Sequence, residues 1–175
     1  AYRAFELEYV LQQSDAKALF LVDRFKTSDY FAMLASVCPE LAAAQDGAVS
    51  AAKFPRLKHV VAMRGDAPAG VLSWAELLTG GERIAAEEMN RRGAELAPLD
   101  PINIQYTSGT TGFPKAATLS HRNLLFNAFY IGASQALTNR DRICIPVPFY
   151  HCFGCVLGTL CSVVYGAAMV IPATY

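Results

Sequence analysis

The sequence predicts an α/β fold in which parallel-rich sheets are flanked by helices. Residues 2–14 carry apolar side chains at helical spacing and are followed by an uninterrupted apolar run at 18–22. The same order returns with a helical pattern from Tyr30 and a second predicted buried strand at 57–63. Uninterrupted apolar runs are typical of strands covered on both faces. Their alternation with helices favours a parallel sheet joined by helical crossovers.

The helices of this leading part carry local signals at their ends. The first places Leu7 and Leu11 four residues apart on one face. The second begins after Asp29, a good capping residue, and stops at Pro39, which cannot continue a helix. Each helix can therefore be placed from its own residues.

Two further helices are predicted before the middle of the chain. Ser73 and Glu76 have the spacing of a capping box and start a short helix. Residues 82–92 form an exposed helix that ends at Gly93. We expect its surface to carry two ion pairs at i, i+4 spacing, Glu87–Arg91 and Glu88–Arg92.

A linker at 94–101, with two prolines, separates this part from an alternating strand. The strand runs from Ile102 to Tyr106, and its alternation places Ile102, Ile104 and Tyr106 on one half-buried face.

The stretch that carries chemistry follows this strand directly. Residues 107–115 are Thr-Ser-Gly-Thr-Thr-Gly-Phe-Pro-Lys, in which Lys115 is the one cation. Glycines allow close backbone approach, and N–H groups, hydroxyls and an ammonium donate to phosphate oxygens. A Walker A loop is excluded, because Lys115 follows Pro114 instead of glycine and precedes Ala116 instead of Ser or Thr. Composition alone leaves two interpretations, a phosphate-binding loop and a polar surface turn.

Beyond the loop, Ser120 predicts the start of a helix that runs to about Leu137, with Ala128 on its apolar side. A turn at 138–141 follows. Residues 143–149 are predicted to be extended, and their two prolines confine them to a sheet edge or a strand end.

The tail of the chain is apolar, and residues 143–175 contain no Asp, Glu, Lys or Arg. A hydropathy window marks 152–172 as a membrane span, which is one interpretation. Because Gly166 interrupts the run, the preferred interpretation is a buried helix at about 153–165 followed by a core strand at 167–171.

The totals limit the classes of function. Hydrophobic residues make up 53% of the 175 residues, enough for a substantial core. Fifteen basic and fifteen acidic side chains cancel, which gives no electrostatic argument for nucleic acid or an anionic membrane. Any anion site must therefore be local.

The five cysteines are predicted to be free, buried small hydrophobes in a reducing compartment. Cys152 and Cys155 have C-x-x-C spacing, but no second such pair accompanies them, so the pattern argues little for metal or redox chemistry. The full set is Cys38, Cys144, Cys152, Cys155 and Cys161.

Residues 107–115 resemble the signature loop of the AMP-binding, adenylate-forming enzymes, which include acyl-CoA synthetases, luciferases and peptide-synthetase adenylation domains. Leu-Ser-His at 119–121 and Pro-Phe-Tyr-His-Cys-Phe-Gly at 148–154 resemble further motifs of the family, in the expected order. The opening helix and strand also resemble those of fatty acyl-CoA synthetases, so the resemblance extends over most of the chain.

This resemblance implies that the chain, which has no initiator Met and no visible signal peptide, is an internal fragment of the large N-terminal domain of such an enzyme. Residues 1–97 would be its leading α/β part, and residues 98–175 its phosphate-loop and acyl-pocket part. The mobile C-terminal domain of the family would be absent.

The implied reaction is ATP-dependent activation of a carboxylic acid, a medium- or long-chain fatty acid, to an acyl-adenylate with release of pyrophosphate. Thioester formation with CoA would follow, and Mg²⁺ would be the cofactor. The fragment alone would be inactive. The implied partners are fatty acid, ATP and CoA, with no nucleic acid and no transmembrane segment, and self-association is left open. The expected location is the cytoplasm, with the mitochondrial matrix as the alternative.

The resemblance also implies site residues. Lys115 and Thr110 would be catalytic, and Thr110 would lie near the magnesium ion. The acid would be bound at a second set, in which His151 positions the substrate and does not act as a base, because a carboxylate needs no deprotonation at pH 7. The ATP-binding set is Thr107, Ser108, Gly109, Thr110, Thr111, Gly112, Phe113, Pro114 and Lys115. The substrate-binding set is Phe149, Tyr150, His151, Cys152 and Gly154.

One departure from the family pattern is Ala116, which stands where a glycine usually follows the lysine. It gives some support to an alternative, a catalytically dead nucleotide-binding or interaction module. A second alternative is an adenylation domain for aryl or amino acids. His59 and His121 are given structural roles only.

Overall fold

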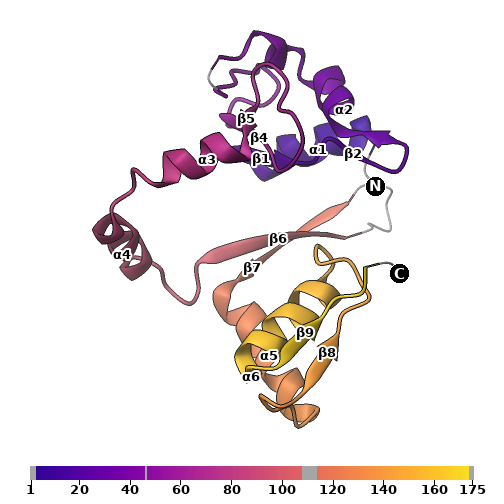
Figure 1. Cartoon of the computed structure of the whole chain (residues 1–175), viewed down its shortest axis with the longest axis vertical. Coiled ribbons are helices and arrows are strands. Elements are labelled where there is room, and N and C mark those ends of the chain that lie inside the picture. The colour runs from indigo at the N-terminus through magenta and orange to yellow at the C-terminus, as the bar shows by residue number, and fades with distance from the viewer. Residues whose placement is uncertain (1–2, 46, 108–113, 174–175) are drawn as a thin grey trace. The chain divides into compact units, whose positions relative to one another are not determined.

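The computed structural model describes residues 3–45, 47–107 and 114–173 of the chain. The contacts divide the chain into two units, Ala1–Arg91 (unit 1) and Arg92–Tyr175 (unit 2), which are coloured from indigo to yellow in Figure 1.

Unit 1 contains the predicted parallel sheet. Its strands are β1 (Ala18–Leu21), β4 (His59–Ala62) and β5 (Leu72–Ser73), in the order β1-β4-β5, and both neighbouring pairs are parallel. The central strand β4 is buried at residues 60–62, as predicted, and exposed at His59. The edge strand β1 alternates between exposed and partly buried residues. The prediction that it is covered on both faces is therefore wrong, because the described residues supply no layer over the face that carries Ala18 and Phe20.

Two helices of unit 1 lie where the sequence placed them. Helix α1 spans Ala4–Ser14 and helix α2 spans Tyr30–Val37. Asp29 caps α2, since its Oδ1 accepts the N–H of Ala32 at 2.9 Å. Leu34 of α2 and Val60 of β4 are fully buried in the core of this unit. The other elements are β2 (Arg24–Phe25) paired antiparallel with β3 (Ser28–Asp29), a 3₁₀ helix η1 (Pro39–Ala43), α3 (Trp74–Gly81) and α4 (Ala86–Ala94).

Helix α4 differs from its prediction at both ends and in its ion pair. It begins at Ala86 and continues through Gly93 to Ala94. Arg91 binds Glu88, three residues earlier, with Nε–Oε2 at 2.8 Å and a second bond from the guanidinium to Oε1 at 2.9 Å. The predicted Glu87–Arg91 pairing is therefore wrong. On a helix surface a residue three positions away is as close as one four positions away. Here the carboxylate of Glu88 accepts two hydrogen bonds from the guanidinium of Arg91.

The capping box at the start of α3 is confirmed. Ser73 Oγ accepts the N–H of Glu76 at 3.2 Å, and Glu76 Oε2 accepts the N–H of Ser73 at 2.7 Å. The hydrogen bonds from the Ser73 backbone and hydroxyl lower the pKa of Glu76 below its usual 4.5. A carboxyl whose pKa is lower in the folded state stabilises the fold above its unfolded pKa.

We expect Glu76→Gln to lower the urea midpoint of unit 1 slightly at pH 7. The difference from wild type should persist down to about pH 4.5 and disappear as the pH falls through the lower folded pKa of Glu76. The single tryptophan, Trp74, is the first residue of α3 and reports unfolding by its fluorescence. Glu82→Gln, at the other end of α3, is the matched control. An equal, pH-independent loss in both variants would contradict the assignment.

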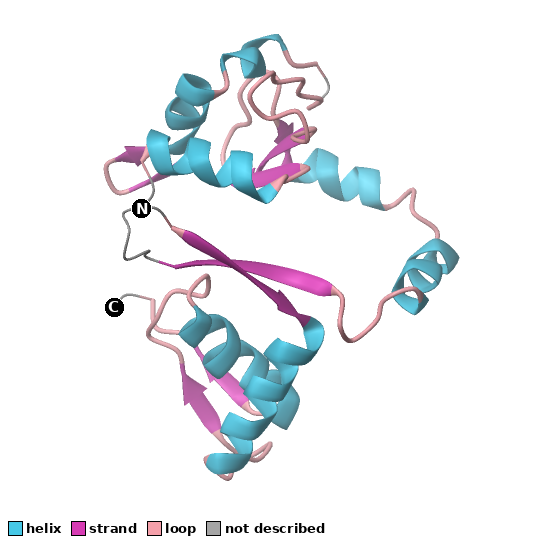
Figure 2. Ribbon diagram, turned by 180° about the vertical axis from the view of Figure 1, so that it is seen from behind, coloured by secondary structure: helices cyan, strands magenta, loops and turns pink. Residues whose placement is uncertain are grey.

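Unit 2 begins with a long antiparallel hairpin, seen in Figure 2 as a twisted pair of strands. It is formed by β6 (Pro101–Thr107) and β7 (Lys115–Ser120). The strand β6 was predicted, but β7 was not, because its residues show no alternation of apolar and polar side chains. The elements after the hairpin are α5 (His121–Ser134), β8 (Arg142–Cys144), a π-type helix η2 (Phe153–Leu160), α6 (Cys161–Tyr165) and β9 (Ala168–Val170), which pairs parallel with β8.

Helices α5, η2 and α6 form the core of unit 2. Ala128 and Cys161 are fully buried and in contact, with the thiol of Cys161 donating to the Ala128 carbonyl at 3.4 Å. Ser120 Oγ caps α5 by accepting the N–H of Asn123, as predicted. The helix ends at Ser134, three residues before the predicted end near Leu137.

Three burial predictions for unit 2 are wrong. Ile102 and Ile104 are 52% and 43% exposed, so the isoleucine face of β6 is the less buried one among the described residues. All three residues of β9 are exposed, although a core strand was predicted. In the segment predicted to be extended at 143–149, strand β8 ends at Cys144, which agrees with the restriction of its prolines to a strand end. Cys144 and Cys152 are also exposed, although Cys38 and Cys161 are buried as predicted. Hydrophobicity favours burial but does not supply the layer that must cover a face.

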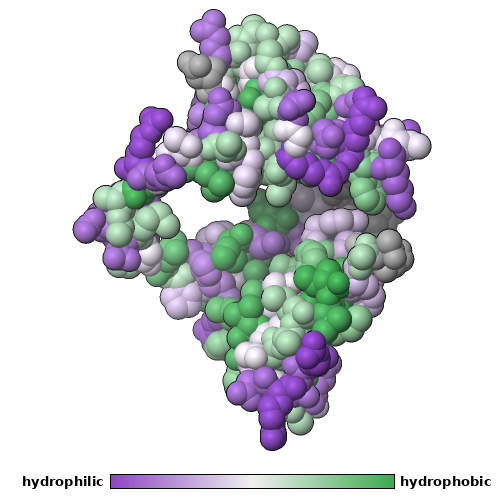
Figure 3. Space-filling model, in the orientation of Figure 1, coloured by the Kyte–Doolittle hydropathy of each residue, from purple (hydrophilic) through white to green (hydrophobic). Residues whose placement is uncertain are grey.

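The apolar tail is divided as the preferred interpretation predicted. The helix ends at Tyr165, Gly166 adopts a left-handed conformation with φ 67°, and β9 follows. Among the described residues, no helix combines the length and apolar character needed to cross a membrane. In Figure 3, green hydrophobic surface gathers over unit 2 in the region of η2 and β9, and purple surface lies where α5 and β8 are joined.

Candidate functional site

The phosphate-loop candidate begins and ends where β6 is joined to β7, at the connected end of the hairpin. Thr107 is the last residue of β6, Lys115 is the first residue of β7, and the two are directly paired across the ladder. Both are exposed, and Pro114 beside them is partly buried. The pairing brings a hydroxyl and an ammonium, both donors to anionic oxygens, to the same strand ends. The candidates outside the described residues are Ser108, Gly109, Thr110, Thr111, Gly112 and Phe113.

Ala116, the departure from the family pattern, lies in β7 opposite Tyr106. Its side chain is exposed and its backbone takes part in the regular antiparallel register. An alanine at this position therefore fits the strand without requiring a glycine.

The second candidate segment is a turn that leads into helix η2. The N–H of His151 donates to the carbonyl of Pro148 at 3.1 Å, which closes the turn. Three aromatic side chains around it are exposed, Phe149 at 45%, Tyr150 at 81% and Phe153 at 50%. The turn thus presents an apolar, aromatic surface.

The ring of His151, at this turn, accepts a hydrogen bond through one of its two nitrogens. Its Nδ1 accepts the backbone N–H of Phe153 at 3.2 Å, so the neutral ring carries its proton on Nε2. The same Nδ1 is 3.7 Å from the thiol sulfur of Cys152, and the His151 carbonyl accepts the N–H of Cys155 at 2.9 Å. These bonds hold the ring at the turn with Nε2–H as its donor.

Gly154 is buried directly behind the turn. A Cβ at this position would meet the carbonyl oxygen of Pro148 and would lie only 3.0 Å from the Cα of Phe149. The glycine is therefore required for the close approach of η2 to the turn, and not for an unusual backbone conformation.

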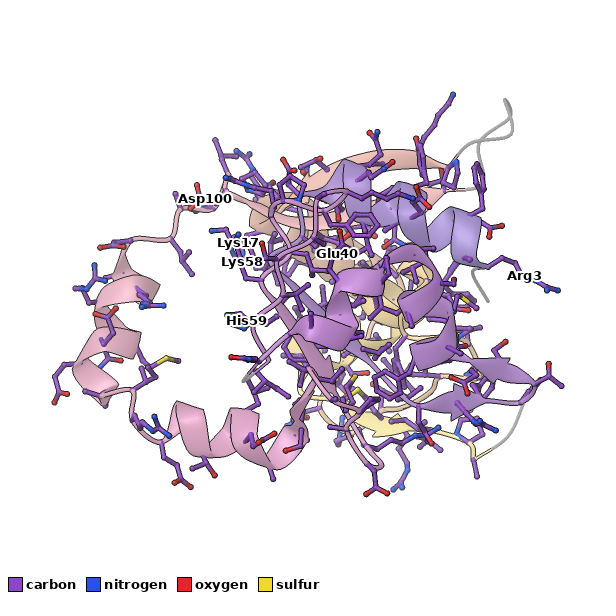
Figure 4. The ribbon with its side chains drawn as sticks, turned by 90° about the horizontal axis from the view of Figure 1, so that it is seen from above. Arg3, Lys17, Glu40, Lys58, His59 and Asp100 are labelled. Atoms are coloured by element: carbon purple, nitrogen blue, oxygen red, sulfur yellow. The ribbon has the colours of Figure 1, made fainter. Side chains whose placement is uncertain are left out.

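The other two histidines have the structural contacts expected of them. His59 Nδ1 is 3.2 Å from the carbonyl oxygen of Gly47, and the backbone N–H of His59 donates to the carbonyl of Lys17 at 3.1 Å. His59 and Lys17 are labelled in Figure 4. His121 starts α5 and donates its N–H to the carbonyl of Asp100 at 3.3 Å.

One residue that joins the two candidate segments was missed by the sequence analysis. Gln105 of β6, two residues before Thr107, donates from Nε2 to the backbone carbonyl of Tyr150 at 3.0 Å. The structure thus brings the strand that leads into the phosphate-loop candidate against the aromatic turn. Nothing in the alternation of β6 distinguishes Gln105 from an ordinary polar strand residue.

Three comparisons place the chain among known proteins. It matches the AMP-binding enzyme family over residues 1–175. It is 43% identical over 169 residues to YngI, a candidate acyl-CoA synthetase of Bacillus subtilis (strain 168), covering 97% of this chain and 31% of YngI. It is 40% identical over 177 residues to the mitochondrial medium-chain acyl-CoA ligase ACSF2 of Rattus norvegicus, covering 99% of this chain and 29% of ACSF2.

Among solved structures, it resembles the anthranilate CoA ligase AuaEII in complex with anthranoyl-AMP, with a TM-score of 0.74 and 21% identity. This match covers 99% of this chain and 29% of AuaEII. At that identity the likeness concerns the fold. The chain spans less than a third of the length of each of these three relatives.

Proposed function

Because the chain belongs to the family of AMP-binding enzymes, we propose that the protein that carries it is an AMP-forming acid–thiol ligase. It activates a carboxylic acid with ATP and then transfers the acyl group to CoA. The family match over residues 1–175 is the observation that carries this proposal, and the names of YngI and ACSF2 agree with it.

The reaction has two steps. A carboxylate oxygen attacks the α-phosphorus of ATP, the bond from that phosphorus to the oxygen bridging to the β-phosphate breaks, and pyrophosphate leaves. The sulfur of CoA then attacks the acyl carbonyl, its proton passes to solvent, and the carbonyl–oxygen bond to AMP breaks. Both steps require anions to approach each other, so positioning and charge stabilisation are the main tasks of the protein.

The described residues suit these tasks. Lys115 and Thr107 provide a cation and a hydroxyl for the phosphates at the end of a rigid hairpin. The turn at Pro148–His151 provides Nε2–H of His151 for the carboxylate and aromatic side chains for an acyl chain. Proton abstraction is not needed for the first step, because the acid is ionised at pH 7.

Magnesium is part of the proposal only through Thr110 and the family resemblance. The described residues do not by themselves form a magnesium site, since Thr107 offers one neutral hydroxyl where Mg²⁺ takes six oxygen ligands. No group of three or more His, Cys, Asp or Glu residues within 3–45, 47–107 and 114–173 is placed to hold a metal ion. No step is therefore assigned to it.

A medium- or long-chain fatty acid is the proposed substrate, in keeping with the name of ACSF2. The proposed location is the cytoplasm, with the mitochondrial matrix as the alternative. Of the two relatives named above, YngI is bacterial and ACSF2 is mitochondrial.

Exchange of labelled pyrophosphate into ATP tests this function in the complete protein that carries the chain. We expect exchange only when a carboxylic acid is added, with medium-chain fatty acids more effective than benzoate, anthranilate or amino acids. A preference for an aryl or amino acid would reassign the substrate. No exchange with any acid, together with binding of ATP, would favour the non-catalytic module.

A further inference from the structure

The hydrogen bond between Gln105 and the Tyr150 carbonyl joins two segments that are 45 residues apart in the sequence. Both segments belong to unit 2, and each contains residues of the proposed site. The bond is therefore placed to set the distance between the proposed phosphate-binding end and the proposed acid-binding turn.

The hairpin side of this contact is rigid. Gln105 is paired with Ala117, and the register continues without a shift from Asn103 to the Thr107–Lys115 pair. The side chain of Gln105 is partly buried. Since the ladder fixes the backbone, the amide group of Gln105 has a defined position relative to Lys115.

The turn side of the contact is packed against η2 at Gly154, and not through the ring of Tyr150. The side chain of Tyr150 is 81% exposed, so the ring does not anchor the turn. The backbone bonds at its base involve Pro148, His151 and Cys155, and none of them reaches the hairpin. The hydrogen bond from Gln105 therefore ties the turn, and with it η2, directly to the hairpin.

We propose that Gln105 is a positioning residue that holds the His151 turn at a working distance from the phosphate-binding end of the hairpin. This inference rests on the proposed function for its catalytic consequence, although the contact itself does not. The chemistry requires a hydrogen-bond donor at this position, because the partner is a backbone carbonyl, which only accepts. Glutamate has the same shape but no donor when ionised. Histidine places a ring N–H at the same number of bonds from Cα.

The activity test uses Gln105→Glu, Gln105→Leu and Gln105→His in the complete protein, at pH 8, where the introduced histidine is neutral. Misplacement of reacting groups by about 1 Å costs up to about 100-fold in rate, and we expect about a tenfold loss of exchange at saturating acid and ATP for the Glu and Leu variants. The KM for ATP should stay within about twofold of wild type, because the hairpin is intact, and Gln105→His should recover most of the rate. Gln135→Glu, the same change on an exposed residue at the end of α5, should behave as wild type.

Amide hydrogen exchange gives a readout that does not depend on activity. In Gln105→Leu we expect faster exchange in the peptide that spans 148–155, and no change in that peptide in Gln135→Glu. Unchanged exchange there, or equal loss of rate in the Glu and His variants, would overturn the positioning role. Absence of pyrophosphate exchange in the wild type would instead refute the proposed function, and the amide measurement would still decide the role of Gln105.

Discussion

Replacement of Lys115 by alanine should abolish most of the carboxylate-dependent pyrophosphate exchange of the complete protein. Removal of a single preorganised donor to developing negative charge typically costs about 100- to 1000-fold in rate, and we expect a loss in that range. The reason is structural as well as electrostatic. Lys115 is exposed at the first position of β7, where pairing with Thr107 fixes its backbone.

A matched variant distinguishes this role from a general effect of charge. Arg140→Ala removes an exposed cation of unit 2 from the turn between α5 and β8. Its exchange rate should stay within about twofold of wild type, as is usual for surface substitutions. If Lys115→Ala and Arg140→Ala have the same activity, the assignment of the hairpin end to phosphate binding is wrong.

Gly154→Ala should produce the second large effect, about a tenfold or greater loss of kcat/KM for the acid. The added Cβ would meet the backbone of Pro148 and Phe149, which cannot rotate away as a side chain can. Accommodation therefore requires movement of the turn that carries His151, and loss of alignment lowers the rate. The KM for ATP should change little, because the hairpin does not contain this contact.

Gly93→Ala is the control for this substitution. Gly93 lies in α4, and a Cβ there would have no described neighbour within 4 Å. The activity of Gly93→Ala should equal that of wild type, and its helix should be slightly more stable, since alanine favours helix over glycine. Wild-type kcat/KM in Gly154→Ala would show that the turn has room to move without loss of function.

Much of the local structure of this protein could be predicted because its causes are local. The caps at Asp29, Ser73 and Ser120 depend on residues three positions apart, and all three are confirmed. The parallel pairing of β1 and β4 followed from the alternation of helices with apolar runs. The family could likewise be recognised from contiguous motifs at 107–115 and 148–154.

Burial was predicted less well, because it depends on a second surface. The apolar residues of β9 and the isoleucines of β6 satisfy the pattern of buried strands, yet the described residues leave them exposed. The pattern of apolar residues indicates which side chains would be stabilised by burial. Whether another layer covers them is a property of the assembled protein.

The sequence by itself determined most of the helices, the caps at Asp29, Ser73 and Ser120, and the motifs that identify the family, since each depends on neighbouring residues. Only the tertiary structure decided that Lys115 pairs with Thr107 across a hairpin and that Gln105 donates to the carbonyl of Tyr150. The contact of Gln105 joins residues 45 positions apart, and no local pattern encodes either contact. Such a contact depends on how the fold positions the donor of one segment relative to the acceptor of the other segment.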